Sequence, residues 1–281
     1  MLGKLMKYEL RATSRTMLPL LLLTLLLSVF TRMTSAVVQS GHSKFITVIN
    51  TLLILAFFLA LIGTAVFSVV LMVVRFRNNL MTDEGYLMFT LPVNRHQLIW
   101  AKLLSALIYT AASAVAVTLS ILLVLLPIAD WSGFWGDLGE LLSSITESLH
   151  FGVPGPLLLL WIAVLAILTV FSGFLMVYAA IALGHSFSNH KILLSVVFFI
   201  AFSLAMQAAG LTFFSTQHAD SIAIEDLRKA IVETVIESGG SADLLLDGTR
   251  FLVIDSIETL VTCGVFYTLT WYNLQKRLNL Q

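Results

Sequence analysis

The sequence predicts an all-α integral membrane protein that crosses the bilayer with six helices. Apolar residues make up 58% of the 281 residues and charged residues only 11%, and the mean hydropathy is +0.96. Soluble domains have about 45–50% apolar and about 25% charged residues. Six segments are long and apolar enough to span a bilayer, which takes roughly 20 residues of helix. Lys and Arg are concentrated on one side of the predicted membrane, as in multi-pass proteins of fixed orientation.

The predicted spans follow one another through the whole chain, which we treat as one transmembrane domain, residues 1–281. They cover about residues 17–38, 46–74, 99–128, 156–183, 192–214 and 251–272. Several are longer than the bilayer requires, which allows a tilt or an extension past the membrane. The first apolar run and its basic leader are both longer than in a cleavable signal peptide, so we expect that run to be retained as a helix.

Residues 1–16 form a predicted amphipathic helix ahead of the first span. Four basic residues recur there every three or four positions, so they share one helical face. They are Lys4, Lys7, Arg11 and Arg15. We expect this face to lie against anionic lipid at the inner membrane surface. The alternative is a positively charged orientation signal without a helix of its own.

The distribution of Lys and Arg predicts that both chain termini are cytoplasmic. Most of the 16 basic residues lie on the side of the N-terminus. They are Lys4, Lys7, Arg11, Arg15, Arg75, Arg77, Arg95, Lys102, Lys191, Lys276 and Arg277. The opposite side carries most of the acidic residues, which fall between Asp130 and Asp247. We therefore expect a multi-pass protein of the cell membrane.

Two long segments, residues 129–155 and 215–250, are predicted to lie outside. Each has a partial helical stripe of apolar residues. Short helices on the outer membrane surface are typical of such stripes, and solvated loops are the alternative.

Two acidic residues of the last span are the candidates for function inside the membrane. Asp255 and Glu258 lie three residues apart and therefore on one helical face. Charged residues within a span are costly and commonly functional. The pair either lines an exit path for cationic groups of a substrate, or lies at a hydrated outer end of the helix. Gln207 in the fifth span is a further candidate for lining a path.

Sequence motifs of catalysis are absent. There is no GxxxxGK[ST] nucleotide-binding loop, no HExxH pair and no GxSxG motif. The six histidines are scattered, and the single cysteine, Cys263, lies in an apolar run. We expect no enzyme active site, metal site or cofactor on this chain. The formal net charge is zero, which gives no indication of a nucleic-acid partner, and we expect none.

The loop between the second and third spans, residues 75–98, combines charges with apolar side chains. Asp83 and Glu84 alternate with apolar residues, and a short helix over about residues 79–89 is predicted to end before Pro92. Apolar side chains on a short charged helix suggest a docking surface. The alternative is a plain connection in which Leu-Pro forms a turn.

Residues 83–104, DEGYLMFTLPVNRHQLIWAKLL, resemble the cytoplasmic segment of type 2 ABC exporter permeases. The matching features are an acidic residue and a glycine, an apolar helix, a Leu-Pro-Val turn, a polar run and a lysine that opens the next span. Here these are Glu84, Gly85, Leu87–Phe89, Leu91–Val93, Asn94–Gln97 and Lys102. The opening, MLGKLMKYELRATSRTMLPL, is similar to the start of such permeases in Gram-positive bacteria.

The resemblance implies that this loop is a coupling helix seated on a separate ATPase subunit, which binds ATP and Mg. The contacts implied by motif position are Asp83, Glu84, Gly85, Tyr86, Phe89 and Arg95. The N-terminal helix would be the connecting helix, and residues 215–250 would supply short outer helices. A second permease, alike or different, would complete the path for hydrophobic or amphipathic substrates such as peptides, antibiotics or lipids.

Two other functions stay open at this level. The chain could be a non-transporting ABC membrane subunit that acts in peptide sensing or immunity. It could also be an ion-coupled carrier that uses Asp255 and Glu258. A neighbouring gene for an ATPase without membrane spans would favour the first of these over the second.

Overall fold

The computed structural model describes residues 2–39, 41, 44–82, 94–125, 155–187 and 190–232, together with residues 242–276 and six isolated positions between 133 and 144. Side chains are described in these ranges except at residues 2, 39, 155–156, 212–251 and 276.

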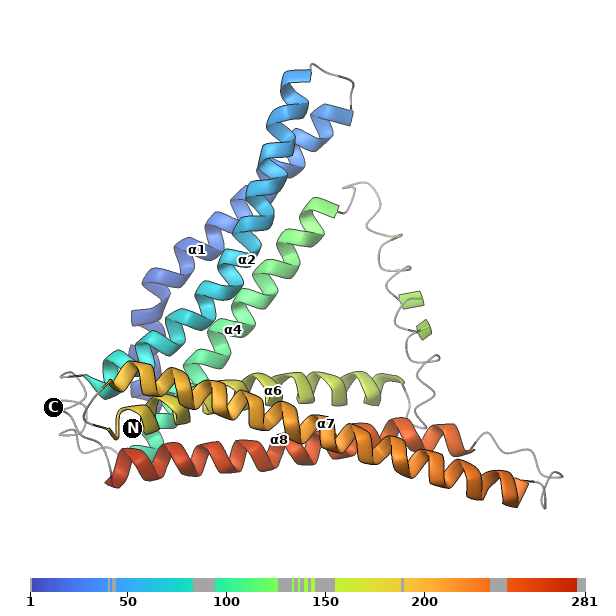
Figure 1. Ribbon diagram of the computed structural model, residues 1–281. Helices are drawn as coiled ribbons and strands as arrows, with labels where there is room; N and C mark the ends of the chain where they lie inside the picture. Colours follow the sequence, from blue (N-terminus) through green and yellow to red (C-terminus); the bar gives the residue numbers. More distant parts are fainter. Residues whose placement is uncertain are drawn as a thin grey trace. The chain divides into compact units, whose positions relative to one another are not determined.

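Six long helices make up the regular structure of the described chain, in which there is no strand (Figure 1). They are α1 (Leu2–Gln39), α2 (Lys44–Met81), α4 (Arg95–Leu125), α6 (Gly155–Gly184), α7 (Lys191–Val232) and α8 (Ala242–Lys276). Each contains a stretch that is long and apolar enough to cross a membrane. The prediction of an all-helical protein with six candidate spans is therefore confirmed, and the helices support a multi-pass membrane protein.

The largest differences between the helix boundaries and the predicted spans occur at three places. α1 is continuous from Leu2 to Gln39, so the predicted N-terminal helix and the first span form one helix. α7 continues to Val232 and α8 already begins at Ala242, so both long helices extend into residues 215–250, for which separate short outer helices or a solvated loop were predicted. Apolar periodicity indicates where a helix can enter lipid, but backbone hydrogen bonding continues past that point wherever Gly or Pro does not interrupt it.

The helices pack as two compact units, residues 1–141 and 142–279. In the first unit, α1 packs against α2 and α4, and these two also contact each other. In the second unit, α6 packs against both α7 and α8. We call these units 1 and 2.

Hydroxyl side chains fill the centre of unit 1. Nine buried Ser and Thr residues lie along its three helices: Thr13, Thr24, Ser28, Thr31, Thr64, Ser68, Ser105, Ser113 and Ser120. Small polar residues let helices approach closely in a membrane. Most of these hydroxyls donate to a carbonyl three or four residues earlier in their own helix, such as Thr24 to Leu21 at 2.8 Å. Ser68 and Ser113 also contact each other across α2 and α4 at 3.3 Å between their oxygens.

Unit 2 has a mainly apolar interior. Leu158 and Leu165 of α6 form a buried cluster with Leu252 of α8, and Trp161 packs against it. At the other end of α6, Gly184 lies so close to Ser195 of α7 that a side chain at residue 184 would overlap the Ser195 backbone. This crossing therefore depends on the absence of a Cβ atom at Gly184.

Large apolar side chains are exposed along all six helices, for example Leu22, Leu55 and Leu204. Hydrocarbon tails can surround such side chains without a cost in free energy, whereas contact of these side chains with water is unfavourable. The exposed surface of the spans is therefore that of a protein in contact with lipid.

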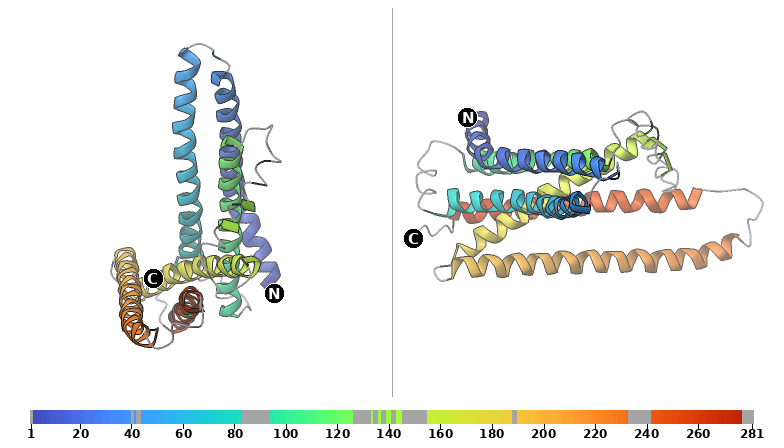
Figure 2. Two further views of the ribbon diagram at one scale, coloured as in Figure 1. Left: turned by 90° about the vertical axis from the view of Figure 1, so that its right-hand side faces the viewer. Right: turned by 90° about the horizontal axis from the view of Figure 1, so that it is seen from above.

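The N-terminal turns of α1 run obliquely to the rest of that helix (Figure 2). Pro19 is the proline inside the helix. It has no N–H to donate to the carbonyl four residues earlier, and its ring crowds that carbonyl, which is the common cause of helix kinks.

Candidate functional site

The candidate site lies at the end of unit 1 where α1 begins, α2 ends and α4 begins, which we call the loop end. The first turns of α1 place different residues on their two faces. Glu9, Thr13 and Met17 are spaced four apart and buried. The basic residues Lys4, Lys7, Arg11 and Arg15 are all exposed. The packed face of this basic segment thus carries its one acidic residue.

A buried ion pair joins α1 to α4 at the loop end. The carboxylate of Glu9 accepts a hydrogen bond from Nζ of Lys102, and their side chains are only 9% and 3% exposed. Each charge would be costly to bury alone, because the surrounding helices replace water with a medium of low dielectric constant. Each therefore requires the other, and α1 and α4 are held in one register.

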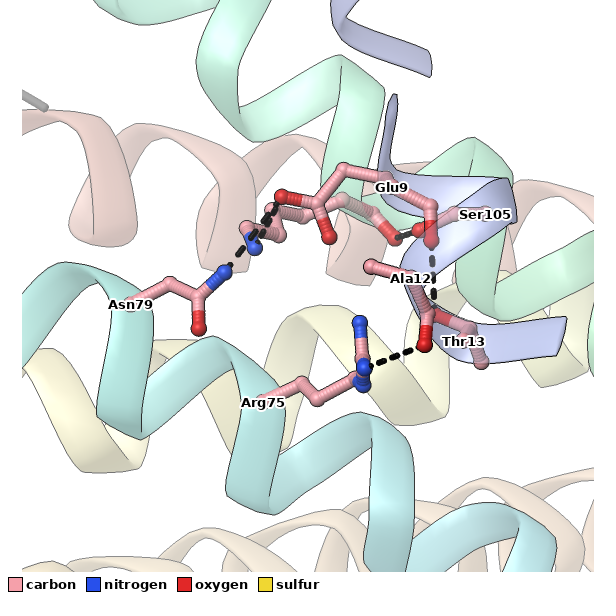
Figure 3. A network of polar contacts seen from close by, with 7 residues as sticks. Glu9, Ala12, Thr13, Arg75, Asn79 and Ser105 are labelled. Atoms are coloured by element: carbon pink, nitrogen blue, oxygen red, sulfur yellow. Dashed lines mark hydrogen bonds and ion pairs between the residues drawn. The ribbon is translucent and has the colours of Figure 1, made fainter. Parts of the chain in front are cut away.

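Asn79 brings α2 into this pair. Its Nδ2 lies 3.4 Å from Oε1 of Glu9 (Figure 3). With the side-chain amide turned over, Oδ1 would accept from Lys102 Nζ at 2.7 Å and Nδ2 would donate to the Arg75 carbonyl at 3.2 Å. We favour the turned orientation, since it pairs both amide atoms with good geometry. In either orientation Asn79, Glu9 and Lys102 connect all three helices, and we call them the Glu9 network.

Two further side chains hold the first turns of α1 through its backbone. Arg75 of α2 donates from Nη2 to the carbonyl oxygen of Ala12 at 2.7 Å (Figure 3). The hydroxyl of Tyr109 in α4 donates to the carbonyl oxygen of Leu10 at 2.6 Å. Since a helical carbonyl has a second lone pair, both bonds add to the helix without replacing its own. The first turns of α1 are therefore fixed in position and in rotation.

The Glu9 network borders the loop between the second and third spans. Asn79 lies near the end of α2 and Lys102 near the start of α4, so they flank residues 83–93 on both sides. The opposed charges of Glu9 and Lys102 neutralise each other. The Glu9 network is therefore a buried connection. It joins α2 and α4, the helices on either side of the loop, to α1.

Most of the expected coupling residues fall in the loop itself. Asp83, Glu84, Gly85, Tyr86 and Phe89 lie outside the described residues. Arg95 is described and is the first residue of α4, where it is half-buried. The predicted helix over residues 79–89 is described only as far as Met81, as the last turn of α2.

The expected path-lining residues lie in unit 2 and are not brought together. Asp255 and Glu258 are half-buried on α8, whereas Gln207 is exposed on α7. The hydrogen bonds between α8 and α6 come from other residues. Trp161 Nε1 donates to Ser256 Oγ at 3.0 Å, and the hydroxyls of Ser172 and Thr262 are 3.2 Å apart. In the described part of unit 2, neither carboxylate forms an ion pair within 4.0 Å.

A polar cluster lies at the end of unit 2 where α6 ends and α7 begins. Ser186 donates to Oδ1 of Asn273 at 3.3 Å, and Asn273 donates to the Leu269 carbonyl at 2.8 Å. The buried ring of His185 lies 2.9 Å from the carbonyl of Ile181. Across the described ranges of the chain, no three His, Cys, Asp or Glu residues are grouped to hold a metal ion.

The Glu9 network was not anticipated from the sequence. Glu9 has no part in the predictions from sequence, and Lys102 enters them only as a basic residue on the side of the N-terminus and as the lysine that opens the third span. The available signal was the spacing of Glu9, Thr13 and Met17, opposite the four basic residues. No protein-family model, curated protein or solved structure matches the chain.

Proposed function

We propose that the chain is the permease subunit of an ATP-driven exporter of the cell membrane, with both termini in the cytoplasm. A separate ATPase subunit binds ATP and Mg and docks on residues 83–93. A second permease, identical or related, completes a path for hydrophobic or amphipathic substrates. The six candidate spans and the absence of a nucleotide-binding loop in the sequence support this division of labour.

The observation that carries the proposal is the position of the Glu9 network beside the docking loop. A loop that transmits force must be attached to the helices that move. Asn79 and Lys102 lie on its two sides, and Lys102 donates both to Asn79 in its turned orientation and to Glu9. A displacement of residues 83–93 is then passed to α1, α2 and α4 together, because moving one alone would separate buried charges.

Docking is attributed to the residues at the matching positions of the loop. Tyr86 and Phe89 supply apolar contact with the ATPase, Asp83 and Glu84 supply charge, and Gly85 permits close approach. Arg95, at the start of α4, lies at the edge of the contact. Aromatic residues in a short cytoplasmic helix are typical anchors of a protein interface.

The test is a double variant, Tyr86→Asp with Phe89→Asp, in the chain co-expressed with its ATPase. We expect loss of co-purification and of substrate-stimulated ATP hydrolysis, since two carboxylates would enter an apolar interface. The matched control is Tyr86→Phe with Phe89→Tyr, which keeps both rings and should keep both activities. Normal assembly and ATP-driven transport in the double Asp variant would disprove the docking assignment.

A second candidate function rests on Asp255 and Glu258. Half-buried carboxylates on a membrane span are suited to bind a coupling cation. In this case transport into vesicles would follow an ion gradient and stop when an ionophore removes it. Transport that needs ATP, ignores the ionophore and persists in the Asp255→Asn, Glu258→Gln variant would exclude this candidate.

A further inference from the structure

One buried hydroxyl group in the middle of unit 1 has no hydrogen-bond partner among the described residues. It belongs to Ser120 of α4, whose side chain is 0% exposed. The other eight buried Ser and Thr residues of unit 1 each donate to a carbonyl three or four residues earlier in their own helix. Because a buried hydroxyl without a partner is costly, the exception at Ser120 indicates a ligand from outside the chain.

The side chain of Ser120 lies on the face of α4 that packs against α1 and α2. Tyr109 and Ser113 share this face, since they precede Ser120 by eleven and seven positions, close to whole helical turns. Tyr109 donates to the carbonyl oxygen of Leu10 in α1, and Ser113 contacts Ser68 of α2. The hydroxyl of Ser120 is therefore directed into the contact between the three helices.

The register of the helices places two other buried hydroxyls at the level of Ser120. α1 and α4 run in the same direction from the loop end (Figure 1), and the contacts between them join positions 93 and 99 apart in sequence. For Ser120 these offsets give residues 21–27 of α1, with Thr24 at the middle. α2 runs the opposite way, so the pair Ser68–Ser113 places Ser120 level with residue 61, one helical turn from Thr64. Thr24 and Thr64 are also fully buried.

These three hydroxyls provide the donors and acceptors that one water molecule requires. The protons of Thr24 and Thr64 are used by the carbonyls of Leu21 and Ala60, at 2.8 Å in both cases. Each threonine oxygen keeps lone pairs that accept, while Ser120 has a proton to donate. A water that accepts from Ser120 and donates to both threonines makes three hydrogen bonds, the usual number for buried water.

We infer that Ser120, Thr24 and Thr64 bind a water molecule that joins α4 to α1 and α2 inside the membrane. Ser120 lies 18 residues beyond Lys102, which is about 27 Å along α4. The water is therefore a second polar attachment of α4, well away from the Glu9 network. A bridging water holds two polar groups nearly as well as a direct hydrogen bond does. The inference does not depend on the proposed exporter function.

Water suits this site better than a cation does. The sequence has no charged residue at positions 16–31 of α1, 45–74 of α2 or 103–125 of α4. A cation would therefore lie in a low-dielectric interior without an opposite charge, which is costly. The other alternative is a rotation of the Ser120 side chain that lets its hydroxyl donate to the carbonyl of Ala116, in the manner common for Ser in helices.

Radiolytic labelling with X-rays tests for the water in the full chain in lipid nanodiscs. Hydroxyl radicals formed from a bound water oxidise the side chains beside it, and mass spectrometry locates the products. We expect oxidation of the buried Leu61, and loss of this oxidation in Ser120→Ala. The matched control Ser28→Ala removes a hydroxyl that bonds within its own helix and should leave the oxidation unchanged. Leu165 in the apolar interior of unit 2 should stay unmodified throughout.

Thermal unfolding of the same variants provides a second measurement. Ser120→Ala should lower the thermal midpoint more than Ser28→Ala does, because the bridge between three helices is lost. Removal of a hydroxyl that has no partner would instead raise the midpoint. An unmodified Leu61 in the unchanged protein, or a midpoint that does not fall in Ser120→Ala, would overturn the inference. A midpoint that rises with Na⁺ but not with choline, and only when Ser120 is present, would assign the site to a cation instead.

Discussion

The two units each hold three helices together, but with different kinds of side chain. Unit 1 holds three helices together with a buried ion pair and a centre of hydroxyl groups. Unit 2 uses leucines, a tryptophan and a close helix crossing at Gly184, and its polar cluster is formed by Ser186, Asn273 and His185. In unit 1 the register is fixed by charge, while in unit 2 it is fixed by shape.

Because of this difference, the two units should be destabilised by different kinds of substitution. A charge without its partner is much more costly in a low-dielectric interior than a missing methyl group is, so unit 1 should be sensitive to single charge changes. Unit 2 should be sensitive to added volume. The charged unit is also the one that carries the loop at residues 83–93.

The largest expected effect comes from breaking the Glu9–Lys102 pair. Glu9→Gln or Lys102→Met alone leaves one buried charge and should destabilise the protein by about 3–5 kcal/mol. Thermal unfolding of the purified protein in detergent measures this. The exchanged pair, Glu9→Lys with Lys102→Glu, should recover part of the loss, since opposite charges again face each other.

An apolar pair separates stability from function at the same site. Glu9→Met with Lys102→Leu removes both charges, and a well-packed apolar replacement of a buried ion pair is often neutral or stabilising. We expect near-normal stability with weakened coupling between ATP hydrolysis and transport. Normal coupling in this stable variant would show that the pair serves only packing.

The helical content and the number of spans were predictable because both depend on local composition. A long, mostly apolar run such as Leu157–Leu175 of α6 has few alternatives to a membrane helix. The spacing of Lys4, Lys7, Arg11 and Arg15 likewise predicts that they share one helical face, since positions three and four apart do so whatever the helix touches.

The Glu9 network was not predictable, because its residues are far apart in sequence. Glu9 and Lys102 are separated by 93 positions, and the choice of partner depends on how α1 and α4 are rotated against each other. Helix ends were missed for a related reason: hydropathy marks where lipid ends, and α7 continues as a helix to Val232.

The next largest effect is expected in unit 2, where helix packing depends on shape. In Gly184→Ala the added Cβ would lie 2.5 Å from the backbone N of Ser195 and 2.7 Å from its Cα, so α6 and α7 must separate. Overpacking of this kind typically costs about 1–3 kcal/mol, and the thermal midpoint should fall accordingly. Ser195→Ala should not rescue the variant, because the clash involves backbone atoms. Full rescue would mean that only the Ser195 hydroxyl is in the way.

The smallest effect concerns the hydrogen bond between Trp161 and Ser256 in unit 2. Trp161→Phe, Ser256→Ala and the double variant form a thermodynamic cycle that isolates the 3.0 Å bond from the lost ring area. We expect a coupling of about 0.6 kcal/mol, the usual size for neutral hydrogen bonds between membrane helices, where the separated helices find other partners. The same cycle on Glu9 and Lys102 should give a coupling several times larger, because no comparable partner exists for a lone buried charge. Equal couplings in the two cycles would remove the distinction between a unit held by charge and a unit held by shape. Unit 1 would then be no better suited than unit 2 to carry the loop that we propose transmits force.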